Sequence, residues 1–129
     1  MSVLTELRTA AKGLLFLSES DAPLKAFVWK GVAIDSAATL LKQLHKDAAT
    51  PVQEIALTDF FAPMSTVQSW HDEAARADVV RFQALVAQLA ALTNTRVFRI
   101  GTGPEILAYA LGTTPDGHTA GVSTLLTET

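Results

Sequence analysis

Three segments in the last third of the chain constrain the fold most, because they follow one another at the spacing of β-hairpins. Residues 95–100, 105–111 and 118–126 have the length and apolar character of strands. The connections, residues 101–104 and 113–117, contain Gly-Pro and Pro-Asp-Gly sequences, which are typical of turns. This pattern predicts a three-stranded antiparallel meander.

The preceding part of the chain alternates between helical and strand periodicity. Apolar side chains recur at three- and four-residue spacing in residues 2–12, 35–46 and 72–92. Ser2, and Asp35 or Ser36, can cap the first two helices, and Asp72 and Glu73 in the first turn of the third suit the helix dipole. Residues 24–29 alternate as a half-buried strand does, and residues 52–57 do so more weakly. Asn94 is expected to end the long third helix.

This order of elements predicts the α+β class, with one antiparallel sheet that needs helices on both faces. Between the second strand and the long helix, residues 59–64 are expected to be irregular. Ser65 and Gln68 fit a capping box, which predicts a short helix with Trp70 on it or just past it. Trp29 and Trp70 are both predicted to be half-buried, and an exposed Trp70 would be an interface anchor.

Composition describes a single globular domain over residues 1–129. Hydrophobic residues make up 49% of the chain and charged residues 18%, which excludes a disordered chain. The absence of cysteine excludes disulfides and thiolate metal sites. The first twelve residues lack a basic segment followed by an apolar one, so we expect a cytoplasmic protein without a signal peptide or membrane span.

The net charge of −3 argues against direct binding to nucleic acid. Its distribution is more informative, because no lysine or arginine follows Arg99 while Glu105, Asp116 and Glu128 do. The acidic C-terminal quarter favours a cationic or metal-bearing partner.

The sequence offers no convincing catalytic or metal-binding group. His45, His71 and His118 lie on different elements without metal-ligand spacing. The glycines of residues 101–104 lack the lysine and the following helix of a phosphate-binding loop. The serines have no nucleophile signature around them. We therefore expect no metal of the protein's own and no cofactor, and a binding role is favoured over an enzymatic one.

An acidic loop within residues 13–31 is the most suggestive local feature. Apolar residues on both sides can anchor the Ser18-Glu19-Ser20-Asp21 run, which would hold Glu19 at a fixed place on the surface. A solvated turn between a helix and a strand is the alternative interpretation.

Several motifs, in this order and spacing, resemble the nuclease A inhibitor family. They are GLLFLSES at residues 13–20, AFVWKG at 26–31, DFF at 59–61, QSW at 68–70, VFRIG at 97–101 and TPDGHTAGVSTLLTET at 114–129. The similarity covers nearly the whole chain and its ends are in register. It implies an α-β-α sandwich.

The resemblance also implies a function and its residues. Family members inhibit sugar-nonspecific DNA/RNA endonucleases that use one Mg²⁺, and a 1:1 complex is expected. A glutamate of the acidic loop and a terminal threonine approach the enzyme's metal, which places these roles on Glu19 and Thr129. Trp70 contributes to the contact surface. Ser69 stands where an acidic residue can precede that tryptophan, so the charge there is weaker. A regulatory binding domain of the same fold, with a partner that is not a nuclease, is the alternative.

Overall fold

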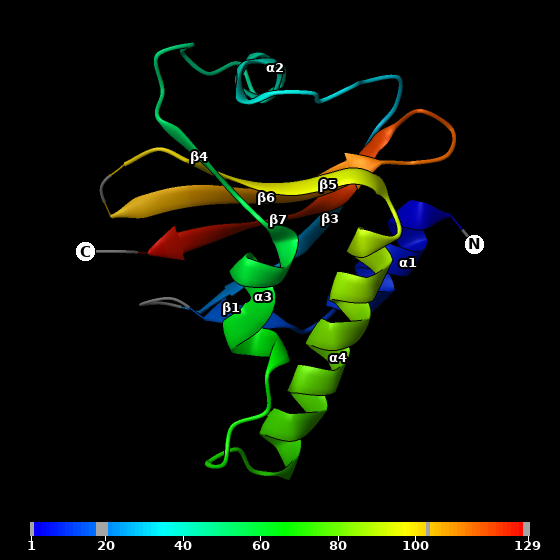
Figure 1. Cartoon of the computed structure of the whole chain (residues 1–129), viewed down its shortest axis with the longest axis vertical. Helices are drawn as coiled ribbons and strands as arrows, with labels where there is room; N and C mark the ends of the chain where they lie inside the picture. Colours follow the sequence, from blue (N-terminus) through cyan, green and yellow to red (C-terminus); the bar gives the residue numbers. More distant parts are fainter. Residues whose placement is uncertain (1, 18–20, 103, 128–129) are drawn as a thin grey trace.

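The computed structural model describes residues 2–17, 21–102 and 104–127. They form a five-stranded antiparallel sheet with helices on both of its faces (Figure 1). A separate two-stranded hairpin, β1 (Leu15–Leu17) and β2 (Asp21–Pro23), lies on the side of the sheet that carries most of the helices. The predicted α+β class and α-β-α sandwich are confirmed.

The main sheet has the strand order β3-β7-β6-β5-β4, and every neighbouring pair is antiparallel. The bounds are β3 Lys25–Trp29, β4 Val52–Ile55, β5 Thr93–Ile100, β6 Glu105–Thr113 and β7 Thr119–Thr127. The predicted meander is β5-β6-β7. Because β7 also pairs with β3, strands from the two ends of the chain lie side by side.

Side chains along β6 show how the sheet separates two cores. Ala108 and Ala110 belong to the larger cluster of buried residues, whereas Tyr109 and Leu111 belong to the smaller one on the opposite face. Successive residues of a strand point to opposite faces, so the continuous apolar run of β6 contributes side chains to both cores.

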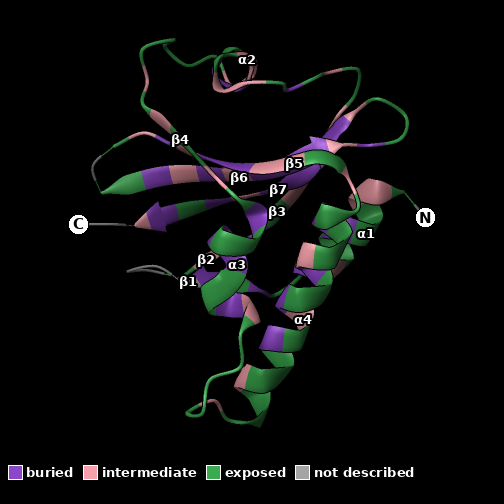
Figure 2. Cartoon of the chain, viewed as in Figure 1, coloured by how far each residue is buried: buried purple, intermediate pink, exposed green. Residues whose placement is uncertain are grey.

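Three helices cover the face with the larger core: α1 (Val3–Ala11), α3 (Leu57–Ser65) and α4 (Glu73–Ala90). Figure 2 shows their buried side turned toward the sheet and toward one another. Full burial of an apolar side chain such as Leu7 of α1 or Phe61 of α3 contributes ~1.5–3 kcal/mol each. No helix in the described ranges is both long and apolar enough to cross a membrane.

Helix α2 (Ala37–Gln43) lies alone on the other face, over the smaller core. Its cap, Ser36, accepts a hydrogen bond from the Thr39 backbone N–H at 3.3 Å. The Thr39 hydroxyl donates to Asp35 at 2.6 Å, and this bond is the main reason why the pKa of Asp35 is lowered. Arg96 donates to the Asp35 carbonyl at 3.0 Å and so ties this segment to β5.

The prediction of an irregular stretch at residues 59–64 is wrong, because these residues belong to α3. Leu57, Phe60, Phe61 and Met64 are buried at three- and four-residue spacing along one face of the helix. Pro63 lies inside the helix but on its exposed side. Burial of the apolar face therefore outweighs the cost of the proline.

The predicted capping box is wrong as well. Ser65 is the last residue of α3, and its hydroxyl donates back to the Phe61 carbonyl at 2.8 Å. Residues 66–72 contain no helix, and Asp72 caps α4 by accepting from the Ala75 N–H at 2.8 Å. Asn94 does not end that helix, which stops at Ala90; Asn94 lies within β5 at φ 55°.

Candidate functional site

The strands that flank the acidic loop are held by an aromatic cluster. Phe16 of β1 is buried, with its ring stacked on Phe60 at a centroid distance of 4.5 Å and edge-on to Phe61 at 5.8 Å. The hairpin register pairs Leu17 with Asp21. Glu19 lies between these two residues in sequence and outside the described residues. The β1 strand that precedes Glu19 is therefore packed against α3 through Phe16.

The end of β7 lies next to this hairpin. The Thr124 hydroxyl donates to the Pro23 carbonyl at 3.0 Å, which links β7 to β2. The last pair of the β6–β7 ladder is Glu105 with Thr127. Thr129 lies outside the described residues. In Figure 1 the described end of β7 and the open end of the β1–β2 hairpin lie on the same side of the molecule.

Trp70 is an exposed side chain on the connection between α3 and α4. Its side chain is 77% exposed, so the prediction of half-burial is wrong and a core role is excluded. The indole contacts the His71 ring edge-on at a centroid distance of 4.3 Å. His71 Nδ1 accepts from the Gln68 N–H at 3.0 Å, which folds the backbone around the neighbouring, exposed Ser69. This local bond holds the connection in a non-helical form that presents Trp70.

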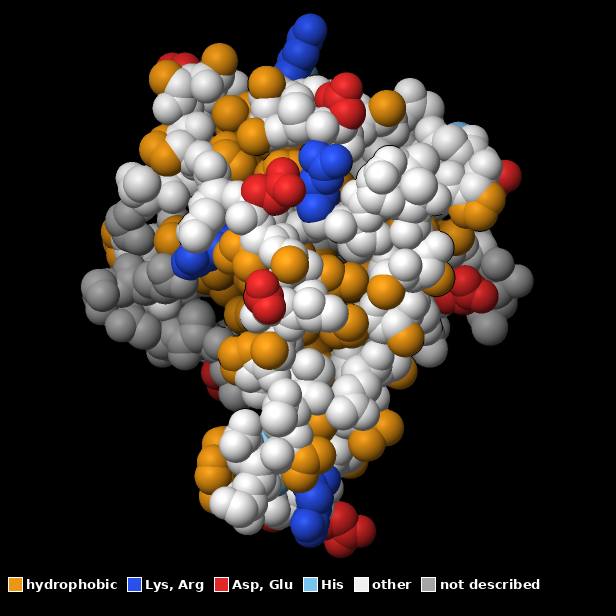
Figure 3. Space-filling model, viewed as in Figure 1, with side chains coloured by type: hydrophobic (Ala, Val, Ile, Leu, Met, Phe, Trp, Pro, Cys, Tyr) orange, Lys and Arg blue, Asp and Glu red, His pale blue; other side chains and the backbone are white. Residues whose placement is uncertain are grey.

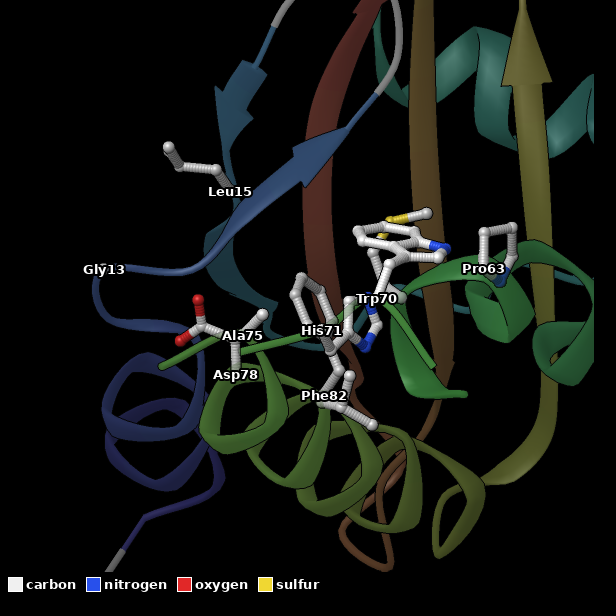
Figure 4. Close-up of a pocket in the computed structure, with 10 residues that line it drawn as sticks. Gly13, Leu15, Pro63, Trp70, His71, Ala75, Asp78 and Phe82 are labelled. Carbon is white, nitrogen blue, oxygen red and sulfur yellow. The ribbon is translucent and has the colours of Figure 1, made fainter. Parts of the chain in front are cut away.

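A groove of about 260 Å³ runs from Trp70 and His71 along α4 to β1 (Figure 4). Its floor contains the buried side chains of Val79 and Phe82. This groove cannot be predicted from the sequence, because its walls come from β1, α3 and α4, which are distant in sequence. Leu15 of β1, at one end of the groove, is 44% exposed, so no other described element covers this side chain completely.

The described histidines show no arrangement that would bind metal or move protons. His118 Nδ1 accepts from the Gly31 N–H at 2.9 Å, as His71 Nδ1 does from Gln68, while His45 occupies a positive-φ turn position. Among the described residues no group of three or more His, Asp or Glu side chains is placed to hold a metal ion. Basic and acidic side chains are interspersed on the face seen in Figure 3, without a basic patch.

Comparison with known proteins gives one result for the whole chain. The family model described as nuclease A inhibitor-like protein matches residues 1–129. A search of curated proteins finds no match. At the level of the family, the match supports a function of the nuclease-inhibitor type with a protein partner, and it confirms the resemblance found in the sequence. The chain belongs to the nuclease A inhibitor-like family.

Proposed function

We propose that this protein inhibits a sugar-nonspecific, Mg²⁺-dependent DNA/RNA endonuclease by binding over its active site in a 1:1 complex. The observation that carries the proposal is the family match over the full length of the chain. The exposed Trp70 and the hairpin beside the end of β7 are compatible with one contact surface on the fold.

Oxygen ligands are the chemical basis of the proposed inhibition. Mg²⁺ is a hard cation that prefers carboxylate, hydroxyl and water oxygens. The Glu19 carboxylate and the hydroxyl and carboxylate of Thr129 would approach the metal of the nuclease, where a substrate phosphate otherwise lies. The metal belongs to the partner, and the inhibitor needs no cofactor.

Trp70 would supply apolar contact area next to this charged centre. A large aromatic side chain that is already exposed gives up little hydrogen bonding when a partner covers it, and tryptophan is enriched among residues that dominate binding energy. Ser69 beside it adds no charge, so this part of the contact would depend on shape and apolar area.

A titration of nuclease activity tests the proposal. Digestion of plasmid DNA by a purified sugar-nonspecific Mg²⁺ endonuclease, best the one encoded in the source genome, is followed at rising inhibitor concentration. Activity should fall to zero at one equivalent, and light scattering should give the mass of a 1:1 complex. A metal-independent ribonuclease serves as the control and should stay active. Stable capture of a different partner, with no effect on such nucleases, would favour the regulatory binding domain instead.

A further inference from the structure

The groove beside Trp70 combines an apolar floor with the carboxylate of Asp78. Val79 and Phe82 are each 4% exposed and form the floor, whereas Trp70 and Leu15 rise from its two ends. Among the described residues that line it, Asp78 is the only carboxylate, and His71 is the only other side chain that can carry a charge. Figure 4 shows the Asp78 carboxylate directed toward the space below β1.

The Asp78 carboxylate has no partner within the described part of the chain. No ion pair or hydrogen bond joins it to another side chain there. Arg81, one turn further along the same helix, is engaged elsewhere, because its guanidinium donates to the carbonyls of Ala10 and Lys12 at the end of α1. A negative charge is therefore left available at the edge of an apolar groove.

We propose that this groove receives a protruding arginine or lysine side chain of the inhibited nuclease, an inference that rests on the proposed function. The aliphatic stem of such a side chain lies along the floor, and its cationic head pairs with Asp78. Basic side chains bury their methylene stems on apolar surface while the charged head stays near water or a counter-charge.

Charge complementarity selects this occupant over a purely apolar one. An apolar side chain would fill the groove but would leave the exposed Asp78 carboxylate without a counter-charge. A basic side chain can pack its methylene stem on the apolar floor and pair its charged head with the Asp78 carboxylate. The contact would use neither Glu19 nor Thr129, so it would set which nuclease is recognised while they block the active site.

Titration of the free protein with a small probe tests the groove by itself. Nα-acetyl-arginine amide is compared by NMR with the citrulline analogue, which has nearly the same shape and no charge. The indole N–H signal of Trp70 is followed and is assigned with Trp70→Phe, since the chain has only two tryptophans. We expect saturable shifts with millimolar affinity for arginine, at least ~5-fold tighter than for citrulline.

Matched variants locate the charge that is responsible. Asp78→Asn should abolish the preference for arginine, whereas Glu73→Gln, which removes a charge from the same helix outside the groove, should preserve it. Equal binding of the two probes, no saturation, or an unchanged preference in Asp78→Asn would overturn the proposal. Dimerisation that Trp70→Ala abolishes would assign the groove to a second copy and also overturn it.

Inhibition assays with the same variants then test whether the groove contacts the nuclease. With a nuclease that the wild-type protein inhibits, Asp78→Asn should weaken inhibition by ~10-fold, and added salt should reduce the difference. Equal potency of Asp78→Asn and wild type would remove the basic side chain from the nuclease contact. Failure of the wild type to inhibit any such nuclease would refute the proposed function instead, while the probe titration would still decide whether the groove selects a cation.

Discussion

Trp70 offers the clearest separation of binding from stability at the scale of single residues. Because its side chain is 77% exposed, Trp70→Ala should change the free energy of unfolding by less than ~1 kcal/mol. The same change should weaken inhibition by more than ~1 kcal/mol if the indole is an interface anchor. Thermal melting and the inhibition constant, measured on one preparation, check both values.

Trp29 provides the matching control. Its ring is half-buried between the rings of Phe27 and Tyr109, at centroid distances of 4.4 and 5.8 Å. Trp29→Ala should therefore lower stability by about 2 kcal/mol or more. A large loss of stability in Trp70→Ala would contradict the exposed position of that side chain.

Glu19 is predicted to act through its charge. Glu19→Gln keeps the size of the side chain and should cost ~2–5 kcal/mol of affinity for the nuclease, the range for one member of a buried interfacial charge pair. The melting temperature should move little, because carboxylates in loops add little to folding stability. Equal inhibition constants for the variant and the wild type would exclude this role.

The sequence predicted some individual residues and not others, for a physical reason. Trp70 could be proposed as an anchor because its motif is local, but its exposure depends on how His71 and Asp72 hydrogen-bond the connection before α4. The groove could not be predicted, because Leu15 and Asp78 become neighbours only when β1 docks beside α4. Hydrophobic periodicity predicts which face of a helix or strand is buried, but it does not predict where two packed elements form a groove.

At the scale of elements, the strands were predicted more accurately than the third helix. The predicted strands 24–29, 95–100, 105–111 and 118–126 correspond to β3, β5, β6 and β7, with ends that differ by at most two residues. Helix α3 was missed because Asp59 and Pro63 weaken its helical signal, although both side chains are exposed. Its stability comes from tertiary burial, which a local sequence pattern does not contain.

The close approach of β6 and β7 can be tested at Gly121. A methyl group there would overlap the Ala110 carbonyl oxygen and lie 2.8 Å from the Leu111 Cα, and both of these are backbone atoms that cannot move independently. Gly121→Ala should therefore lower the free energy of unfolding by ~2 kcal/mol or more, measured by denaturant titration. Ser123→Ala, a change on the same strand and face, should have little effect. Similar stability in both variants would contradict the tight β6–β7 spacing.

At the scale of the whole molecule, the position of the chain end gives the sharpest prediction for the proposed function. A His-tag after Thr129, or deletion of Thr129, should weaken inhibition at least ~10-fold, because the tag turns the terminal carboxylate into an amide and the deletion removes the threonine hydroxyl and moves the carboxylate by one residue. Circular dichroism should stay unchanged, since the last described ladder pair involves Thr127. The same tag before Met1 is the control and should leave inhibition intact. Full potency of the C-terminally tagged protein would remove Thr129 from the mechanism.

The overall architecture followed from the sequence because its elements and turns are locally encoded, and the resemblance indicated the same sandwich. The arrangement of the candidate surface did not follow, since it draws on a hairpin, the connection between two helices and the end of β7. Packing of Phe16 on α3 and the bond from Thr124 to Pro23 bring these parts together. Such long-range contacts exist only in the assembled fold.

The strand order also determines when the protein can fold during its synthesis. Within the main sheet β3 pairs only with β7, although Lys25–Trp29 leaves the ribosome long before Thr119–Thr127. Chains emerge N-terminal end first, and pairing between distant segments is slow. A ribosome that stalls after β6 therefore holds a chain whose β3 has no partner in the main sheet and whose larger core lacks the side chains of β7. The sheet can close only after translation has passed β7, because β7 lies between β3 and the β5–β6 hairpin.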